Sequence, residues 1–420
     1  MPKKQLTDSL ALDDAAPSPG LAGWQATGLA LAAAAMAARA GLGTLVGAVL
    51  LAPIVYALVR LRRHAPGARS TAELVGSTLG PRGAAFAGVL QVTGYVLLAV
   101  TAAQFIGQVF VPQQATTDPL SPIELNHWLW SLWAVAAIVV AAMLVFALPG
   151  RVVASLAAVL ALVGLLIQFY YALAVAARAM TGTVTEQIVS HDPPPTLGVL
   201  GTLTVLAVSL FGVEVVTTRT RRGSSNGWPM SLAVGVVALI AAVTWWAAQQ
   251  SGWGGNSLNG STFGIAVGEL YGDTGATVVT VGAAMFIFAA LLALLWGIAA
   301  VTEGLDAKAS PDTVFAGLVV AMVVLAVAVI QADWTPGYVG GLVLLALYAV
   351  VLVANSGIAA DSVVTWWLRF VMPVVLAAVV LLPLLSAEFS LGALEPVFVA
   401  AVLVAAAAAT ALLGTRSRPD

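Results

Sequence analysis

Glu214 is the residue in this sequence whose type and surroundings point most clearly to chemistry. It lies in an apolar run that begins near Pro195 and ends before the basic tract 219–222. Inserting an acidic side chain near the middle of a membrane helix costs roughly 2.5 to 3.5 kcal/mol, so such residues usually face a bundle interior or an aqueous pathway. A carboxylate held away from water also binds a proton more readily than it does in solution. We therefore expect Glu214 to act in proton coupling or gating.

The residues around Glu214 allow two interpretations of its environment. Gly212 stands two positions before it, and Pro229 opens the next apolar stretch. A glycine beside an intramembrane carboxylate indicates a broken helix whose freed backbone groups line a cavity. Alternatively, Glu214 lies about 7 Å along the helix axis from Arg219 and extends to the membrane surface.

The composition defines the class of protein that must position this carboxylate. Sixty per cent of the 420 residues are hydrophobic, 9% are charged, and the mean hydropathy is +1.00. Because a soluble domain has roughly 25% charged residues, the sequence predicts an all-α integral membrane protein. The absence of cysteine excludes disulfides and thiolate metal sites. We expect no metal, no cofactor, no nucleic acid and no enzymatic activity, since the histidines have no ligand spacing and the buried acids are isolated.

Cutting the chain at its glycine, proline and charged residues predicts twelve membrane spans of about 20 residues each. The predicted spans are 24–39, 42–61, 83–110, 128–148, 151–177, 196–218, 229–249, 275–302, 313–331, 337–354, 363–385 and 394–414. The first is short at about 24 Å, which indicates a re-entrant or interrupted helix. An eleven-span alternative has one long helix over 24–61 and places the amino terminus outside.

The positions of the basic residues support the division into twelve spans, because short cytoplasmic loops accumulate lysine and arginine. With both termini inside and residues 1–22 as a polar cytoplasmic tail, only Arg39 and Arg178 of the 17 basic residues fall outside. The sequence therefore predicts a multi-pass protein of the cytoplasmic membrane with both termini cytoplasmic.

Two further groups of side chains are candidates for substrate contact. Trp296 lies deep in the span 275–302, although membrane tryptophans favour the interfaces; core packing explains it equally well. Gln91, Tyr95 and Gln104 are interpreted as lying on roughly one face of the span 83–110. Interhelical hydrogen bonding is the alternative role for these three residues.

Several of these motifs resemble one transporter family. Phe211-Gly212-Val213-Glu214, followed by a polar tract and Trp228-Pro229, is similar to the sixth-span motif of the amino acid-polyamine-organocation (APC) transporters. The segment 261–303 resembles the seventh-loop and eighth-span region of bacterial arginine/agmatine antiporters, with Trp296 at a matching place. The segments 53–66 and 72–76 resemble the second span and following loop of bacterial amino-acid efflux permeases. Together these motifs cover roughly residues 41–310.

The resemblance implies a LeuT-type fold, in which spans 1 and 6 are discontinuous and the substrate binds near the midplane. It implies two inverted five-span repeats, at about 24–177 and 196–354 within a transporter domain over 23–415, plus extra spans at about 363–414. Carried over to this chain, Phe211 and Gly212 would border the site, Trp296 would wall it, and Glu214 would be its proton-coupling or gating residue.

The first span departs from the family pattern. Family members have a Gly-Ser/Thr-Gly break there, whereas this chain has an alanine-rich run followed by Arg39-Ala40-Gly41-Leu42-Gly43. The backbone that binds the substrate carboxylate is therefore missing or displaced to Gly41 and Gly43. Arg39 would then either substitute for it through its guanidinium or cap a short helix at the surface.

The resulting functional expectation is a secondary transporter of amino acids or related amines, using alternating access with proton coupling or substrate exchange. Its partners would be the small-molecule substrate, the lipid bilayer and protons. The alternative is a non-transporting membrane subunit or sensor, which the altered first span would suit.

Overall fold

The computed structural model describes most of the chain between residues 21 and 358. The described residues are 21–36, 43–68, 70–110, 123–181, 212–217, 227–250, 260–304, 310–332, 334, 336–358, 366–367 and 371. They form nine α-helices and the 3₁₀ segment η4 (Val213–Thr217), and no strand of a sheet occurs among them. The predicted spans 363–385 and 394–414 and most of 196–218 lie outside the described residues.

The helices follow the apolar segments of the sequence. They are α2 (Gly23–Ala34), α3 (Gly43–His64), α4 (Thr71–Phe110), α5 (Ile123–Ala147), α6 (Gly150–Met180), α8 (Gly227–Gln250), α9 (Gly260–Gly304), α10 (Pro311–Gln331) and α11 (Gly337–Ser356). The 3₁₀ segment η4 spans Val213–Thr217. Within this part of the chain, seven helices (α4, α5, α6, α8, α9, α10 and α11) are long and apolar enough to cross a membrane. The chain is therefore a multi-pass membrane protein, and its full count of twelve spans stays a prediction.

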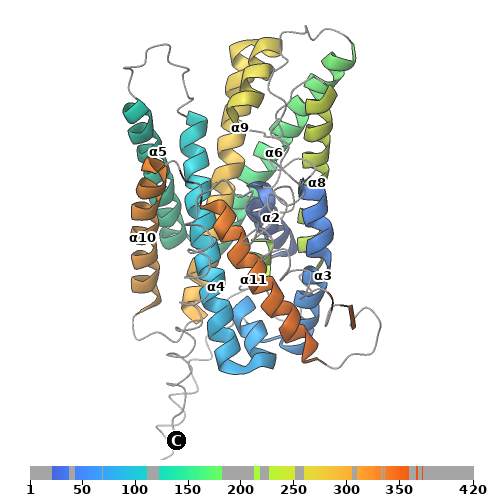
Figure 1. The fold of residues 1–420 in the computed structure, drawn as a ribbon, viewed down its shortest axis with the longest axis vertical. Helices are drawn as coiled ribbons and strands as arrows, with labels where there is room; N and C mark the ends of the chain where they lie inside the picture. The colour runs from blue at the N-terminus through green and yellow to red at the C-terminus, as the bar shows by residue number, and fades with distance from the viewer. Residues whose placement is uncertain are drawn as a thin grey trace, which may run out of the picture.

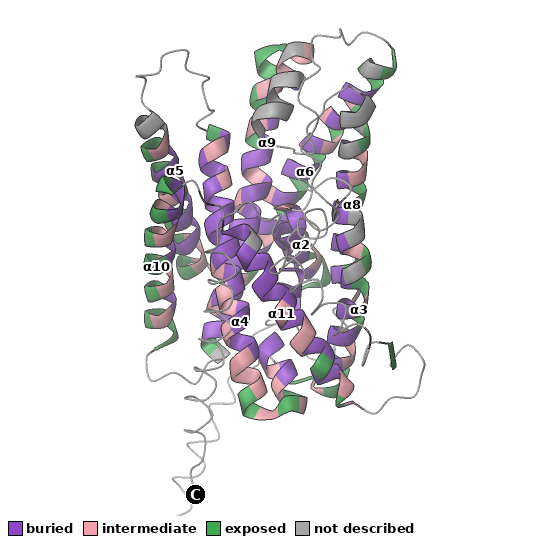
Figure 2. Cartoon of the chain, in the orientation of Figure 1, coloured by how far each residue is buried: buried purple, intermediate pink, exposed green. Residues whose placement is uncertain are grey.

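The helices separate into a buried centre and a periphery. α9 and α11 are the most buried of the seven spanning helices, and α10 is the least; α5 and α10 stand together at one side of the bundle (Figures 1 and 2). The outward face of α5 carries exposed apolar side chains, among them Leu132, Met143 and Phe146. Such a surface is compatible with hydrocarbon and not with water, because lipid tails are as apolar as these side chains.

Small residues let the central helices approach one another closely. A Cβ atom added to Gly164 of α6 would lie 2.5 Å from the carbonyl oxygen of Gly282 and 2.8 Å from the nitrogen of Phe286, both in α9. Likewise, a Cβ on Gly94 of α4 would overlap Leu344 of α11. Glycine at these crossings maximises van der Waals contact, which drives helix association where no hydrophobic effect operates.

Gly164→Ala is expected to destabilise the protein by about 1 to 3 kcal/mol, because the backbone of α9 must move to admit the methyl group. Gly317→Ala in α10 is the matched control, since no atom lies within 4 Å of its added Cβ. Thermal unfolding in detergent, followed by loss of the monodisperse species, measures both variants. Equal stability of the two would show that the α6–α9 crossing is not close-packed.

Two helices begin earlier than predicted, because each contains a sharp turn at a glycine. Gly80 (φ 75°, ψ −176°) separates residues 71–79 from the rest of α4, and Gly272 (φ 73°, ψ −178°) separates residues 260–271 from the rest of α9. We call these short leading helices the first hook and the second hook. Only glycine adopts this backbone conformation readily. The predicted spans 83–110 and 275–302 begin within a few residues of the long helical parts after these turns, and the two hooks before the turns were not predicted.

The two hooks are equivalent in sequence and lie at opposite ends of the molecule (Figure 1). Residues 75–84 and 267–276 share the pattern Val-Gly-x-x-x-Gly-x-x-Gly-Ala. In each, the second residue packs on the last: an added Cβ would lie 2.7 Å from the Cβ of Ala84 in the first and 3.3 Å from that of Ala276 in the second. An inverted internal repeat would produce this pair of hooks. The repeat boundaries at about 24–177 and 196–354 remain a prediction.

The first span is a short helix. α2 has 12 residues, or about 18 Å, followed by a brief 3₁₀ turn at 35–36. Its α-helix therefore ends before the predicted limit of 39, and the described residues do not form the single long helix over 24–61 of the eleven-span alternative. α2 packs against α6, where Gln25 Nε2 donates to the Ser155 hydroxyl at 3.0 Å.

Candidate functional site

Glu214 lies on the 3₁₀ segment η4, within the sixth predicted span. The segment begins after Gly212, whose φ of 105° is accessible to glycine and strained for other residues. The backbone N–H of Val215 donates to the Gly212 carbonyl at 2.9 Å, which closes the tight turn. We call Gly212 and η4 together the break; Glu214 lies inside the bundle there, and its side chain is fully buried.

Several hydrogen-bond donors surround the Glu214 carboxylate. The Tyr348 hydroxyl of α11 donates to Oε2, and the backbone N–H of Gly212 donates to the same oxygen at 3.1 Å. The Tyr95 hydroxyl of α4 interacts with the carboxylate and accepts a hydrogen bond from Gln91 Nε2 at 3.0 Å. A buried carboxylate needs such donors, because water no longer solvates it. We call Glu214, Tyr95, Tyr348 and Gln91 the carboxylate cluster.

This arrangement excludes one of the two interpretations of Glu214. An acid that extends to the membrane surface would be exposed, whereas Glu214 accepts from the side chain of a residue 134 positions away. The surface interpretation was therefore wrong. The second oxygen, Oε1, is buried and has no hydrogen-bond partner among the described residues, and the same holds for Gln91 Oε1.

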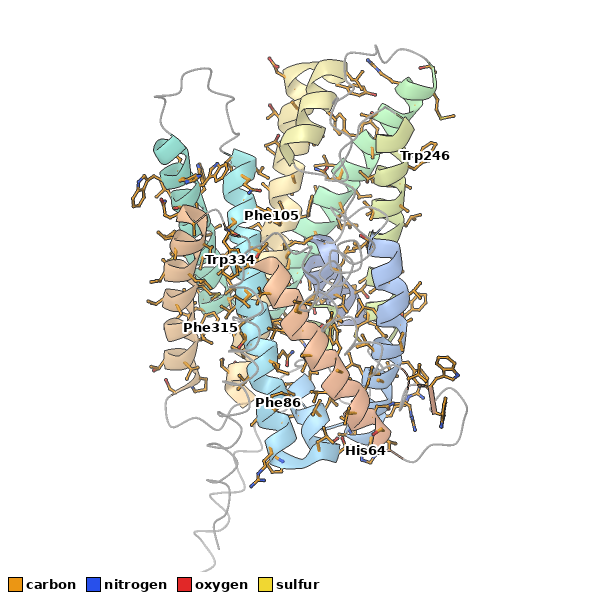
Figure 3. All side chains as sticks on the ribbon, in the orientation of Figure 1. His64, Phe86, Phe105, Trp246, Phe315 and Trp334 are labelled. Atoms are coloured by element: carbon orange, nitrogen blue, oxygen red, sulfur yellow. The ribbon has the colours of Figure 1, made fainter. Side chains whose placement is uncertain are left out.

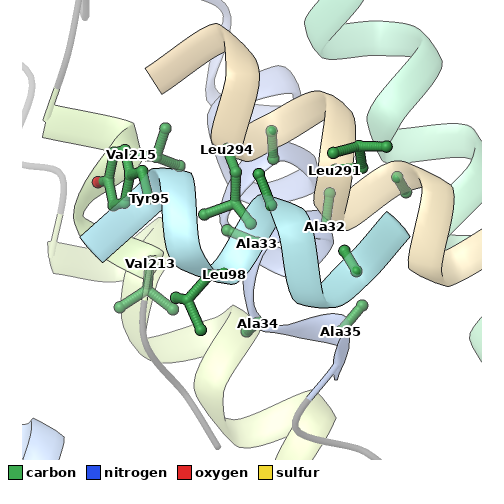
Figure 4. Close-up of a cluster of buried hydrophobic side chains, with 14 of the residues drawn as sticks. Ala32, Ala33, Ala34, Ala35, Tyr95, Leu98, Val213, Val215, Leu291 and Leu294 are labelled. Atoms are coloured by element: carbon green, nitrogen blue, oxygen red, sulfur yellow. The ribbon is translucent and has the colours of Figure 1, made fainter. Parts of the chain in front are cut away.

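Apolar side chains of α2 and α9 enclose the break. Ala32 to Ala35 at the end of α2 and Leu291 and Leu294 of α9 gather around Val213, Val215 and Tyr95 (Figure 4). Gly297 lets the ring of Tyr95 lie directly on α9: a Cβ there would be 2.6 Å from Tyr95 Cε2 and 2.8 Å from Val215 Cγ2. The cluster is thus held in an apolar, close-packed environment.

The structure brings together part of the predicted substrate site. Gly212 donates to Glu214, and Gln91 donates to Tyr95, which interacts with the same carboxylate. Gly43 is the first residue of α3. Trp296 is buried beside Gly297, about 100° around α9 from it, and its indole nitrogen has no partner among the described residues. The predicted site residues Phe211 and Gly41, together with Arg39, lie outside the described residues.

The expectation that Gln104 shares a face with Gln91 and Tyr95 was wrong. Nine residues correspond to two and a half helical turns, which places Gln104 opposite Tyr95. Its amide instead donates at 2.9 Å to the carbonyl of Trp334, in the connection between α10 and α11 (Figure 3).

Tyr348 is the main member of the cluster that sequence analysis missed. The sequence does single out Tyr348 to some degree, because it carries the one hydrogen-bonding side chain between Tyr338 and Asn355. A single tyrosine in a membrane span is nevertheless not enough to predict a functional site. No group of three or more His, Asp or Glu side chains that could hold a metal ion occurs in the part of the chain that the structure describes.

The arrangement of the helices places the chain in a structural class: it is a multi-pass membrane protein with a LeuT-type fold. It is similar to the crystal structure of MhsT in complex with L-phenylalanine, with a TM-score of 0.57 and 13% sequence identity. The likeness covers 86% of this chain and 99% of MhsT. No protein-family model and no curated protein sequence matches the chain.

Tyr348→Phe is expected to destabilise the closed cluster, since it removes a donor from a buried carboxylate at a cost of about 1 to 3 kcal/mol. The melting temperature of the purified protein in detergent should therefore fall, and thermal unfolding measures this change. Tyr56→Phe is the matched control, because this tyrosine of α3 is 43% exposed and its loss of a hydroxyl should leave the melting temperature unchanged. An equal decrease in both variants would show that the Tyr348 hydroxyl does not stabilise the cluster.

Proposed function

We propose that the chain is a secondary transporter of amino acids or related amines that works by alternating access, coupled to protons or to substrate exchange. The observation that carries the proposal is the carboxylate of Glu214, which is fully buried after the turn at Gly212, accepts from Tyr348 of α11 and interacts with Tyr95 of α4. A static scaffold has no use for such a group, because burying it costs several kcal/mol. The LeuT-type fold supports the same assignment.

Backbone groups near the break can bind both charged groups of an amino acid. α2 ends beside Gly212, and an added Cβ there would lie 4.0 Å from the Ala33 carbonyl oxygen. Carbonyl groups at the end of a helix favour a cation, and free N–H groups at the start of one favour an anion. We propose that the ammonium of the substrate binds at the end of α2 and its carboxylate at backbone N–H groups of the interrupted sixth span. Phe211, Gly41, Gly43 and Trp296 remain proposed contacts.

Glu214 is proposed to couple a proton to closure of the bundle. As a carboxylate it accepts from Tyr348 and the Gly212 N–H; once protonated, it carries a proton of its own to donate. That change rearranges contacts among η4, α4 and α11. Binding or release of a proton therefore biases the relative positions of these elements, which is what alternating access requires.

The test is uptake by the purified protein in proteoliposomes, with a panel of radiolabelled amino acids and amines and an imposed pH gradient. We expect at least one substrate to accumulate or to exchange against the unlabelled compound. Absence of both uptake and exchange for the whole panel would contradict a transport function.

A non-transporting subunit or sensor is the second candidate, and the 12-residue length of α2 favours it. Thermal stabilisation by substrate separates the two. A transporter binds at least one member of the panel and its melting temperature rises with ligand concentration; a scaffold subunit shows no shift with any member.

A further inference from the structure

A buried pair of threonine hydroxyls joins the first hook to the segment that carries Glu214. Thr71 Oγ1 and Thr217 Oγ1 lie 2.9 Å apart, and both residues are almost completely buried. Thr217 also donates to the backbone carbonyl of Glu214 at 2.7 Å. Because each hydroxyl has a single proton, Thr71 must donate to Thr217.

Thr71 is available for this contact because its neighbour caps the helix. The Ser70 hydroxyl accepts from the backbone N–H of Glu73 at 3.2 Å, which is the usual role of a residue at the start of a helix. Thr71 is the first residue of the first hook, and its hydroxyl is directed to η4 instead.

The pair completes a ring of contacts around Glu214. From the first hook, the chain turns at Gly80 into α4, and α4 brings Tyr95 to the Glu214 side chain. Thr71 and Thr217 bring the start of the same helix to the Glu214 backbone. α4 is therefore linked to Glu214 at two points separated by the turn at Gly80: through Tyr95 to the side chain, and through Thr71 and Thr217 to the backbone.

We propose that Thr71 and Thr217 are positioning residues that hold Glu214 in the closed carboxylate cluster and release it when the first hook moves. The proposal rests on the transport function above and adds the element that controls the site. Opening towards the end of the molecule that carries the first hook must separate this hook from η4. The hydroxyl pair allows two states of the first hook, bound to η4 or separated from it. Intermediate positions are unfavourable, because the two buried hydroxyls lose their hydrogen bond to each other in a single step.

The test uses the absence of cysteine from the chain, which makes a single introduced thiol a specific probe. Ala34→Cys places this thiol at the buried end of α2, beside the break. Its rate of reaction with a membrane-impermeant maleimide is measured in full-length protein in vesicles, with reagent on the side of the first hook. The measurement requires no transport.

Thr217→Val and Thr71→Val, which keep the side-chain shape and remove the hydroxyl, are each expected to raise the labelling rate about tenfold. The double variant should react no faster than about twice the single variants, because both remove the same contact. Thr217→Ser restores the hydroxyl and should label at the wild-type rate. Thr244→Val is the matched control: among the described residues, this buried hydroxyl bonds to Ile240 of its own helix alone, and the labelling rate should not change.

The proposal is overturned if Thr217→Val labels like the wild type, if the two valine effects multiply, or if Thr217→Ser behaves like Thr217→Val. Multiplied effects would show two independent packing losses, and failure of the serine variant would show that the methyl group matters rather than the hydroxyl. A wild type without uptake or exchange would instead refute the transport function and leave the labelling result to decide the role of the pair.

Discussion

Glu214→Gln is expected to abolish the pH dependence of uptake across about pH 5 to 8 while leaving substrate exchange measurable. Glutamine has nearly the shape of glutamate, and its oxygen can still accept from Tyr348 and the Gly212 N–H. It has no proton to gain or lose in this range. Uptake driven by a pH gradient should therefore fall by about tenfold or more, whereas exchange needs no net proton movement.

The measurement compares gradient-driven uptake and counterflow in proteoliposomes of matched protein density. Asp312→Asn is the control, because this acid lies exposed in the first turn of α10 and should retain the wild-type profile. If wild-type flux is constant over the same pH range, Glu214 has no proton-coupling role and its cluster is a purely structural contact.

Gly212→Ala is expected to have the second-largest effect, through the backbone rather than through a clash. The added Cβ would lie 3.4 Å from Leu294 and 3.5 Å from Ala33, which is ordinary contact. The φ of 105°, however, costs a residue with a side chain about 1 to 3 kcal/mol. The turn that presents Glu214 to Tyr348 should open, and uptake should fall by about tenfold or more.

Gly235→Ala provides the comparison, since this glycine lies in regular helix with no atom within 4 Å of its added Cβ. It should transport like the wild type and be equally or slightly more stable. Thermal stability and uptake are measured for both variants. Wild-type uptake by Gly212→Ala would show that the interrupted helix is not required for function.

Hydropathy alone predicted most of the helices, because a chain that must exclude water from its backbone along about 30 Å leaves long apolar runs. The predicted spans 128–148 and 313–331, for example, agree within a few residues with α5 and α10. The hooks were missed for the opposite reason. They are short and contain polar residues, and their turns depend on the conformation of one glycine each.

The candidate site shows the same division between local and long-range information. A carboxylate beside a glycine in an apolar run was enough to single out Glu214 and Gly212, and a spacing of four placed Gln91 beside Tyr95. Nothing local could pair Glu214 with Tyr348, because that contact depends on the way α11 packs against its neighbours.

The sequence by itself therefore determined the class of the protein, the approximate positions of its helices and the residue whose burial requires an explanation. These properties follow from the transfer free energies of side chains, which are local. Only the tertiary structure decided that Glu214 points inward, that tyrosines of two helices hold it, and that a threonine pair ties it to the first hook. Those facts depend on which helices meet, and the packing of small residues at the crossings selects that arrangement.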